Sequence, residues 1–302
     1  MGLSDVKLDW NQVLKNWLHV LKHLLTEPSA LFWWPTLAIA LLGVAALYVT
    51  AQSHAIHRSH TGSYLKELPL DLICLLAYTF TQVAMAPVAV AITVAGTTLV
   101  LMAAGIPAVS GADYPFAVDG FVALLVFLAA DFALYWSHRL FHRFRPLWAL
   151  HKLHHQPTVL TPITAFRFWP PETAVHLCAF ALGEGIALGI AAEFLGLTLS
   201  PIKFAGINIF LAAWYLAFSH LRHSNVAFYF PMFLSRLLVS PHMHQAHHSS
   251  DPMHHHRNFG TALSLWDWLF GTLYIPPKDE RFEFGLGVAQ AATYRPIKAI
   301  QT

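Results

Sequence analysis

Long apolar stretches restrict the folds that this chain can adopt. Residues 31–50 form one such stretch, and residues 116–136 form another. A helix of about 20 apolar residues crosses a hydrocarbon core of about 30 Å. The chain of 302 residues is 56% hydrophobic and only 11% charged, whereas soluble domains carry about 25% charged residues. These features predict an all-α integral membrane protein.

Three further stretches extend this pattern. Residues 72–106 are apolar for too long to form one simple span, and Pro87 lies near their middle. We therefore expect either a kinked helix or two short helices in a hairpin there. Residues 174–198 and 202–219 are separated by a Ser-Pro break. In total the sequence predicts about four to six transmembrane helices.

Charge and cysteine content argue against other classes of protein. The net charge is only +2 and no basic run is present, so nucleic acid is not expected as a partner. Cys74 and Cys178 both lie in apolar stretches and are expected to be small buried side chains rather than a disulfide or metal pair. Residues 1–29 mix polar and apolar positions, which predicts an amphipathic surface helix and no cleavable signal peptide.

Twenty histidines are present, and those after residue 137 fall mostly into short groups. Histidine is costly in lipid and needs a polar partner there. Residues three or four positions apart share one face of a helix, so their imidazoles lie about one turn apart, a spacing that suits a metal ion. The groups are His138 and His142; His151, His154 and His155; His220 and His223; His244, His247 and His248; and His254 to His256.

The order of spans and histidine groups predicts that the groups meet. The first group follows one span, and the last groups follow two more. Because two crossings return a chain to the side from which it started, all groups can lie on one face of the membrane. Nine of the 18 Lys and Arg residues lie between Arg139 and Arg257, so the positive-inside tendency places this face in the cytoplasm.

The ligand type narrows the choice of metal. Imidazole binds Zn, Cu, Fe and Ni, and the lack of paired cysteines argues against an iron–sulfur cluster. Eight or more imidazoles exceed the three or four that one ion usually takes, so two ions are expected. In the second group, His155 is expected to reach the second ion. A redox-capable cationic core favours iron and oxygen activation, although the ligand type leaves zinc and copper open.

The grouped histidines resemble the HxxxH, HxxHH and HxxHH signatures of the fatty acid hydroxylase and sterol desaturase superfamily. Their surroundings are also similar to that family, including the Asp-Phe pair before the first group, the His-Ser-Asn triplet and the Asn-Phe-Gly segment. The resemblance covers residues 116–275, which we expect to form a catalytic domain. Residues 1–115 would supply the N-terminal helices, and residues 276–302 a tail.

Carried over residue by residue, the resemblance implies a set of metal ligands. His223 and His220 are added to the set, although only two residues separate them and some relatives have a wider spacing. His255 is included either as a metal ligand or as a hydrogen-bond donor to a metal ligand. The remaining implied ligands are His138, His142, His151, His154, His155, His244, His247 and His248.

Two polar residues are candidates for supporting roles. Asp131 precedes His138 by seven residues, which is two turns on the same helix face. Its carboxylate is expected either to orient a ligand imidazole, as metal-bound histidines require, or to pack between helices. Asn258 is expected to act similarly.

The resemblance also implies the chemistry. Two ferrous ions would use O2 and external electrons to hydroxylate or desaturate an unactivated C–H bond in a lipid, such as a sterol or fatty acyl chain. Zinc is a possible substitute in the same sites. The electrons would come from a separate ferredoxin or cytochrome b5 and its reductase. We expect a bacterial inner membrane, or the endoplasmic reticulum in a eukaryote.

Two other classes remain open from the sequence. One is a histidine-rich membrane protein that binds or transports zinc, and the other is a non-catalytic lipid-binding relative. Within the enzyme class, an ether-lipid monooxygenase with a pterin reductant is a further variant.

Overall fold

The computed structural model describes residues 61–105, 116–195, 203–204, 207–214, 220–224 and 226–287, with a few helical positions between residues 11 and 22. The span expected at residues 31–50 lies outside the described residues. Most of the expected N-terminal surface helix, and the tail beyond residue 287, lie outside them too.

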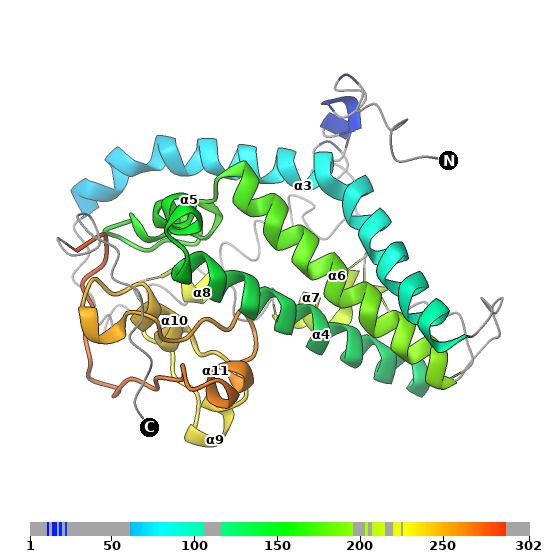
Figure 1. The fold of residues 1–302 in the computed structure, drawn as a ribbon. Coiled ribbons are helices and arrows are strands. Elements are labelled where there is room, and N and C mark those ends of the chain that lie inside the picture. The colour runs from blue at the N-terminus through cyan, green and yellow to red at the C-terminus, as the bar shows by residue number, and fades with distance from the viewer. Residues whose placement is uncertain are drawn as a thin grey trace.

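Three long helices form the membrane region. They are α3 (Thr61–Ala104), α4 (Phe116–Arg143) and α6 (Pro170–Leu195), which run side by side in Figure 1. Within them, Leu65–Ala104, Ala117–Arg143 and Pro170–Leu195 are long and apolar enough to cross a membrane. The mostly helical fold class is therefore confirmed, and the described residues contain three of the expected spans.

The stretch expected to span at residues 202–219 is not a long helix in its described part. It contains the two-residue strands β1 (Lys203–Phe204) and β2 (Ile207–Asn208), which pair antiparallel, followed by the short helix α7 (Ile209–Trp214). Residues 215–219 lie outside the described part.

Helix α3 is continuous over 44 residues and contains both Pro69 and Pro87. Figure 1 shows it bent through its middle rather than folded back as a hairpin. Proline removes a backbone donor and clashes with the preceding turn, which bends a helix without ending it when neighbouring elements support it. The kinked helix is thus the correct alternative for residues 72–106, and the hairpin is wrong.

Small residues bring the three helices close together. A Cβ atom at Gly185 of α6 would collide with the backbone of Thr93 in α3, and one at Gly183 would collide with the backbone of Ala129 in α4. The hydroxyl of Thr97 donates to the carbonyl of Gly185 at 3.0 Å. Close backbone approach and such hydrogen bonds are the usual sources of helix association in lipid, where burial of apolar surface contributes little.

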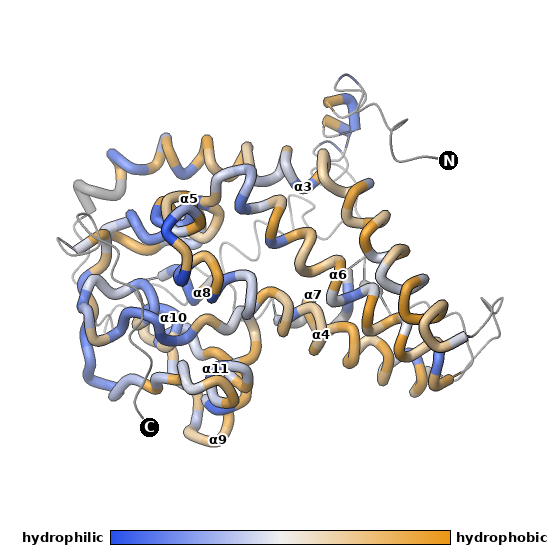
Figure 2. The backbone as a smooth tube through the Cα atoms, in the orientation of Figure 1, coloured by the Kyte–Doolittle hydropathy of each residue, from blue (hydrophilic) through white to orange (hydrophobic). Residues whose placement is uncertain are grey.

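A polar domain of short elements lies at one end of the three long helices (Figure 1). Figure 2 shows the contrast in hydropathy between this end and the long helices. The elements are α5 (Arg145–His155), η3 (Thr164–Phe166), α8 (His220–Arg222), α9 (Met232–Ser235), α10 (Pro241–His247), η5 (Pro252–His254) and α11 (Leu265–Leu269). The elements that carry the histidine groups therefore all lie at this end, as expected, although the described part of residues 202–219 contains no long helix that would make the second crossing.

Candidate metal centre

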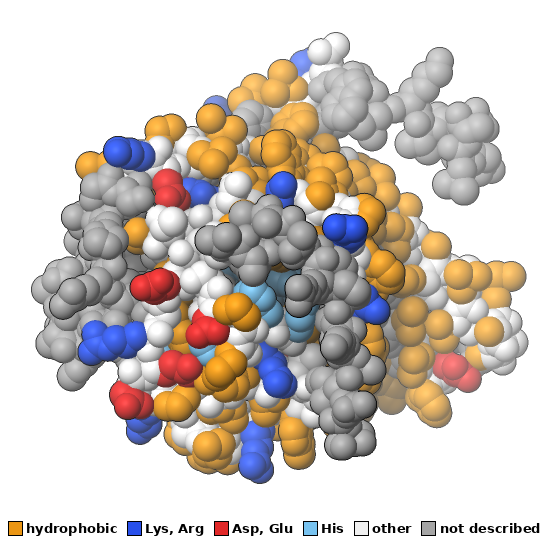
Figure 3. Space-filling view, turned by 60° about the vertical axis from the view of Figure 1, so that its left-hand side comes forward, with side chains coloured by type: hydrophobic (Ala, Val, Ile, Leu, Met, Phe, Trp, Pro, Cys, Tyr) orange, Lys and Arg blue, Asp and Glu red, His pale blue; other side chains and the backbone are white. Residues whose placement is uncertain are grey.

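Three helices and one short turn supply the histidines of the site. The first group lies at the end of α4, the second on α5 and the fourth on α10, while His223 follows α8. Helix α10 begins at Pro241, because the Ser240 hydroxyl accepts a hydrogen bond from the backbone N–H of Met243 and Pro241 occupies the first turn. Figure 3 shows some of the histidine side chains at this end of the molecule.

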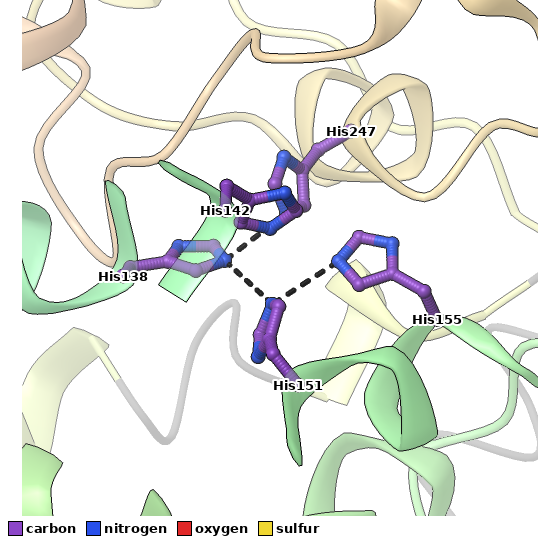
Figure 4. Close-up of side chains that lie close together, drawn as sticks. All are labelled: His138, His142, His151, His155 and His247. Carbon is purple, nitrogen blue, oxygen red and sulfur yellow. Dashed lines mark hydrogen bonds between the residues drawn. The ribbon is translucent and has the colours of Figure 1, made fainter. Parts of the chain in front are cut away.

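Five buried histidines form one cluster, which we call the five-histidine cluster. Their possible ligand atoms all lie within 4.8 Å of one another. The Nε2 atom of His138 lies 3.1 Å from Nε2 of His151 and 3.1 Å from Nε2 of His247 (Figure 4). Two nitrogens bound to one ion at about 2.1 Å with a right-angle geometry are about 3 Å apart. The members are His138, His142, His151, His155 and His247.

Four further buried histidines form the four-histidine cluster. Nε2 of His244 lies 3.0 Å from Nε2 of His223 and 3.1 Å from Nε2 of His248. The two clusters adjoin, since the rings of His155 and His248 stack with their centroids 4.5 Å apart. The members are His154, His223, His244 and His248.

The histidines of α5 are divided between the two clusters differently from what the sequence predicted. His151 and His155, one full turn apart on α5, both point into the five-histidine cluster. His154 is the member of this group that reaches the other cluster, although His155 was expected to do so.

Burial favours the neutral form of several of these imidazoles. It lowers the pKa of His247 to about 3 and lowers the pKa of His155, His244 and His248 well below the ordinary value. The neutral imidazole is the form that binds metal ions. The Nε2 atom of His142 is buried and has no hydrogen-bond partner among the described residues. A metal ion would satisfy that atom, so the residues fit a metal centre.

Several imidazoles are oriented by a hydrogen bond at Nδ1, the ring nitrogen that faces away from the cluster. Nδ1 of His138 donates to the carbonyl of Phe259 at 2.8 Å, and Nδ1 of His247 donates to the carbonyl of Arg257 at 2.7 Å. Nδ1 of His223 lies 3.0 Å from the Thr164 hydroxyl. Such partners fix the ring orientation and the tautomer, so that Nε2 faces the other imidazoles of its cluster.

Glu172 is the supporting residue that the sequence reasoning missed. It lies in the first turn of α6, is completely buried, and accepts a hydrogen bond from Nδ1 of His151. His176, one turn later, lies 3.5 Å from the same carboxylate oxygen and 2.8 Å from the Ser137 hydroxyl. A glutamate four residues before a histidine, at the start of an apolar stretch, was the available signal.

Asp131 does not orient an imidazole directly, which corrects one of its two expected roles. Its carboxylate accepts hydrogen bonds from the backbone N–H groups of Ala262 and Leu263, at 2.9 and 3.1 Å, and from the Trp266 indole at 3.0 Å. It therefore acts on the site through the loop that carries Phe259, whose carbonyl holds His138.

Asn258 is likewise a backbone partner rather than an imidazole partner. Its amide nitrogen donates to the carbonyls of Met243 and Tyr274, and its oxygen accepts from the N–H of Tyr274. Its φ of +55° is a left-handed conformation that asparagine tolerates better than most residues. His255 belongs to neither cluster, and the side chain of His220 lies outside the described part of the structure.

Ion pairs of a buried arginine connect the loop between α5 and α6 to helix α3. Arg167 is almost fully buried, and its guanidinium contacts the carboxylates of Asp71 and, at 2.9 Å, Glu67. The next residue, Phe168, stacks on His154 with centroids 4.4 Å apart. Helix α3 thus supports the four-histidine cluster through this loop.

Removing Arg167 should be strongly destabilising. Arg167→Met leaves the Asp71 carboxylate buried without its partner, which costs about 3–5 kcal/mol. Adding Asp71→Asn should recover part of this loss because the unpaired charge is removed. Denaturant unfolding of the two single variants and the double variant measures the coupling, and strictly additive effects would contradict the pairing.

Comparison with known proteins gives a consistent result. The fatty acid hydroxylase family model matches residues 123–272. An ornithine lipid hydroxylase of Rhizobium tropici is 31% identical over 167 residues, which are 55% of this chain and 46% of that protein. The alkylglycerol monooxygenase of Danio rerio is 28% identical over 162 residues, 54% of this chain and 32% of that protein.

The human alkylglycerol monooxygenase is 26% identical over 173 residues, 57% of this chain and 34% of that protein. The matches therefore span less than half of the length of each of these relatives. No solved structure gives a significant match.

Proposed function

The chain belongs to the fatty acid hydroxylase superfamily, and we propose that it is a membrane-bound oxidoreductase that hydroxylates a lipid at an unactivated C–H bond. One observation carries this proposal: nine buried imidazoles form two adjoining clusters at the polar end of three candidate membrane spans. A protein that only binds lipid needs no such arrangement.

We infer that the two clusters hold two iron ions. Each cluster offers at least the three or four nitrogen ligands that one ion takes. Iron in such a donor set supplies activation of O2 and oxidation of a C–H bond. The names of the relatives, a hydroxylase and a monooxygenase, support this choice over zinc. Zinc is expected to occupy the same ligands as a substitute.

The residues of the chain orient the ligands and exclude water. Glu172 and the carbonyls of Phe259 and Arg257 hold three imidazoles of the five-histidine cluster in place. Phe259 is itself fully buried beside His138, with ring centroids 5.7 Å apart. A site closed in this way protects reactive species from side reactions with water.

We propose a polar lipid with a long hydrocarbon chain as the substrate, and hydroxylation rather than desaturation as the reaction. The named substrates of the relatives, an ornithine lipid and an alkylglycerol, are lipids of this kind. The electrons would come from a separate ferredoxin or cytochrome b5 with its reductase. We place the histidine end in the cytoplasm, at a bacterial inner membrane.

Comparison of cellular lipids tests this proposal. Cells that produce the protein should contain a lipid that carries one additional oxygen atom, and cells without the gene should lack it. His154→Ala with His155→Ala removes one ligand from each cluster and should abolish the product. Mass spectrometry of lipid extracts measures both results. A product that persists in this variant would contradict metal-dependent oxidation and favour a protein that only binds or transports metal.

A further inference from the structure

Two short helices of the polar domain expose apolar side chains. Helices α9 and α11 lie together, because Ser264, just before α11, bonds to the end of α9. Its hydroxyl donates to the carbonyl of Ser235 at 2.8 Å, and its backbone N–H donates to the carbonyl of Leu237 at 3.1 Å. Six large apolar side chains on and beside these helices are exposed, and we call them the α9–α11 patch. They are Met232, Phe233, Leu237, Trp268, Leu269 and Phe270.

The patch is attached to the side of a membrane span. Trp266 of α11 packs against Phe132 of α4 with ring centroids 5.0 Å apart, and Phe270 packs against Trp136 at 5.0 Å. Trp266 also lines an apolar hollow of about 370 Å³ between α4 and α6, together with Ile186 and Ile190. Helix α11 therefore contacts the same outer surface that the spans present to lipid.

The contacts with α4 indicate how deep the patch lies in the membrane, relative to the end of the apolar part of that helix. The apolar part of α4 ends at Trp136, and polar residues follow from Ser137. Asp131 precedes Trp136 by five residues, which is about 8 Å along a helix. Its carboxylate binds the backbone N–H groups of Ala262 and Leu263. Ala262 and Leu263, just before α11, thus lie about 8 Å deeper than Trp136, where the apolar part of α4 ends.

Non-helical backbone is tolerated at that depth only where its polar groups are satisfied by protein. Asp131 does this for the two N–H groups and also accepts from the Trp266 indole at 3.0 Å. This accounts for a buried carboxylate within an otherwise apolar span. Asp131 supports an element that enters the membrane region from the side.

Basic side chains border the patch. Arg236 follows α9 directly and is exposed. The guanidiniums of Arg139 and Arg257 lie 3.5 Å from the carbonyls of Phe270 and Gly271, at the end of α11. Apolar side chains beside arginines are typical of segments that insert into the acyl chains while their charges contact anionic headgroups.

We propose that the α9–α11 patch inserts into the lipid leaflet on the histidine side of the membrane. The partner is the bilayer itself, with hydrocarbon around Phe233 and Leu269 and phosphate groups near the arginines. This contact is separate from the spans and from the proposed chemistry. It holds the polar domain against the leaflet.

A matched pair of spin labels tests this insertion. Phe233 and Met253 are both 70% exposed, but Met253 lies on η5 beside the exposed, acidic Asp251. Nitroxides are attached to Phe233→Cys and Met253→Cys, in a chain whose Cys74 and Cys178 are replaced by alanine. The protein is reconstituted in vesicles of phosphatidylcholine and phosphatidylglycerol. Accessibility to O2, relative to a water-soluble nickel complex, should be several-fold higher at position 233.

Equal ratios at the two positions would overturn the proposal. Shielding of position 233 from both reagents would overturn it too, because protein would then cover the patch. If the cysteine-free chain does not fold, bromine-labelled lipids give a second measurement. They should quench more tryptophan emission in the otherwise unaltered chain than in Trp268→Phe, and equal quenching would contradict insertion.

Discussion

His244→Ala is expected to remove one of two bound metal ions and to lower lipid hydroxylation by more than about 100-fold. The Nε2 atom of His244 lies between those of His223 and His248, at 3.0 and 3.1 Å. Losing a partner behind a ligand already costs about 10–100-fold in affinity or activity, and losing the ligand itself should cost more. Elemental analysis of the purified variant and a hydroxylation assay measure the two effects.

Two companion variants make this result specific. His247→Ala should remove the ion of the five-histidine cluster and leave the other. His242 lies on the same helix, is equally buried and belongs to neither cluster, so His242→Ala should keep both ions. Loss of metal from His242→Ala, or two retained ions in His244→Ala, would contradict the assignment of ligands.

Glu172→Ala is expected to weaken metal binding and to lower activity about 10–100-fold without removing any ligand. Its carboxylate accepts the hydrogen bond from Nδ1 of His151, which fixes that ring and makes Nε2 a stronger donor to a metal. Glu172→Gln should show a smaller loss, because its amide oxygen still accepts this hydrogen bond. The fraction of metal retained at increasing chelator concentration measures the effect.

A glutamate elsewhere on the same helix provides the control. Glu193 lies near the other end of α6, and Glu193→Gln should bind metal as the unaltered protein does. If Glu172→Ala and the unaltered protein lost metal at the same chelator concentration, Glu172 would have no role in positioning His151.

Local periodicity made much of the site predictable. Histidines three or four residues apart must share a helix face, so each group could be recognised without a structure. All nine histidines of the two clusters were among the expected ligands. The apolar lengths of α4 and α6 likewise predicted these spans, because lipid restricts a spanning segment to a long apolar helix.

Contacts between distant segments could not be predicted in this way. His154 and His155 are neighbours in the chain, yet they enter different clusters because α8 and α10 approach α5 from a particular side. The partners of Asp131 lie 131 to 135 residues away, in the loop before α11 and in α11 itself. Spacing along α4 placed this carboxylate near His138, but only the packing of the loop shows that its hydrogen bonds go to backbone.

The metal content of the unaltered protein tests the central claim most directly. The protein is purified without chelators, in lipid nanodiscs, from cells supplied with iron, and its metals are counted per chain by elemental mass spectrometry. Two adjoining clusters of five and four histidines predict two ions per chain, with iron as the main metal. Fewer than one ion per chain would contradict a two-metal centre.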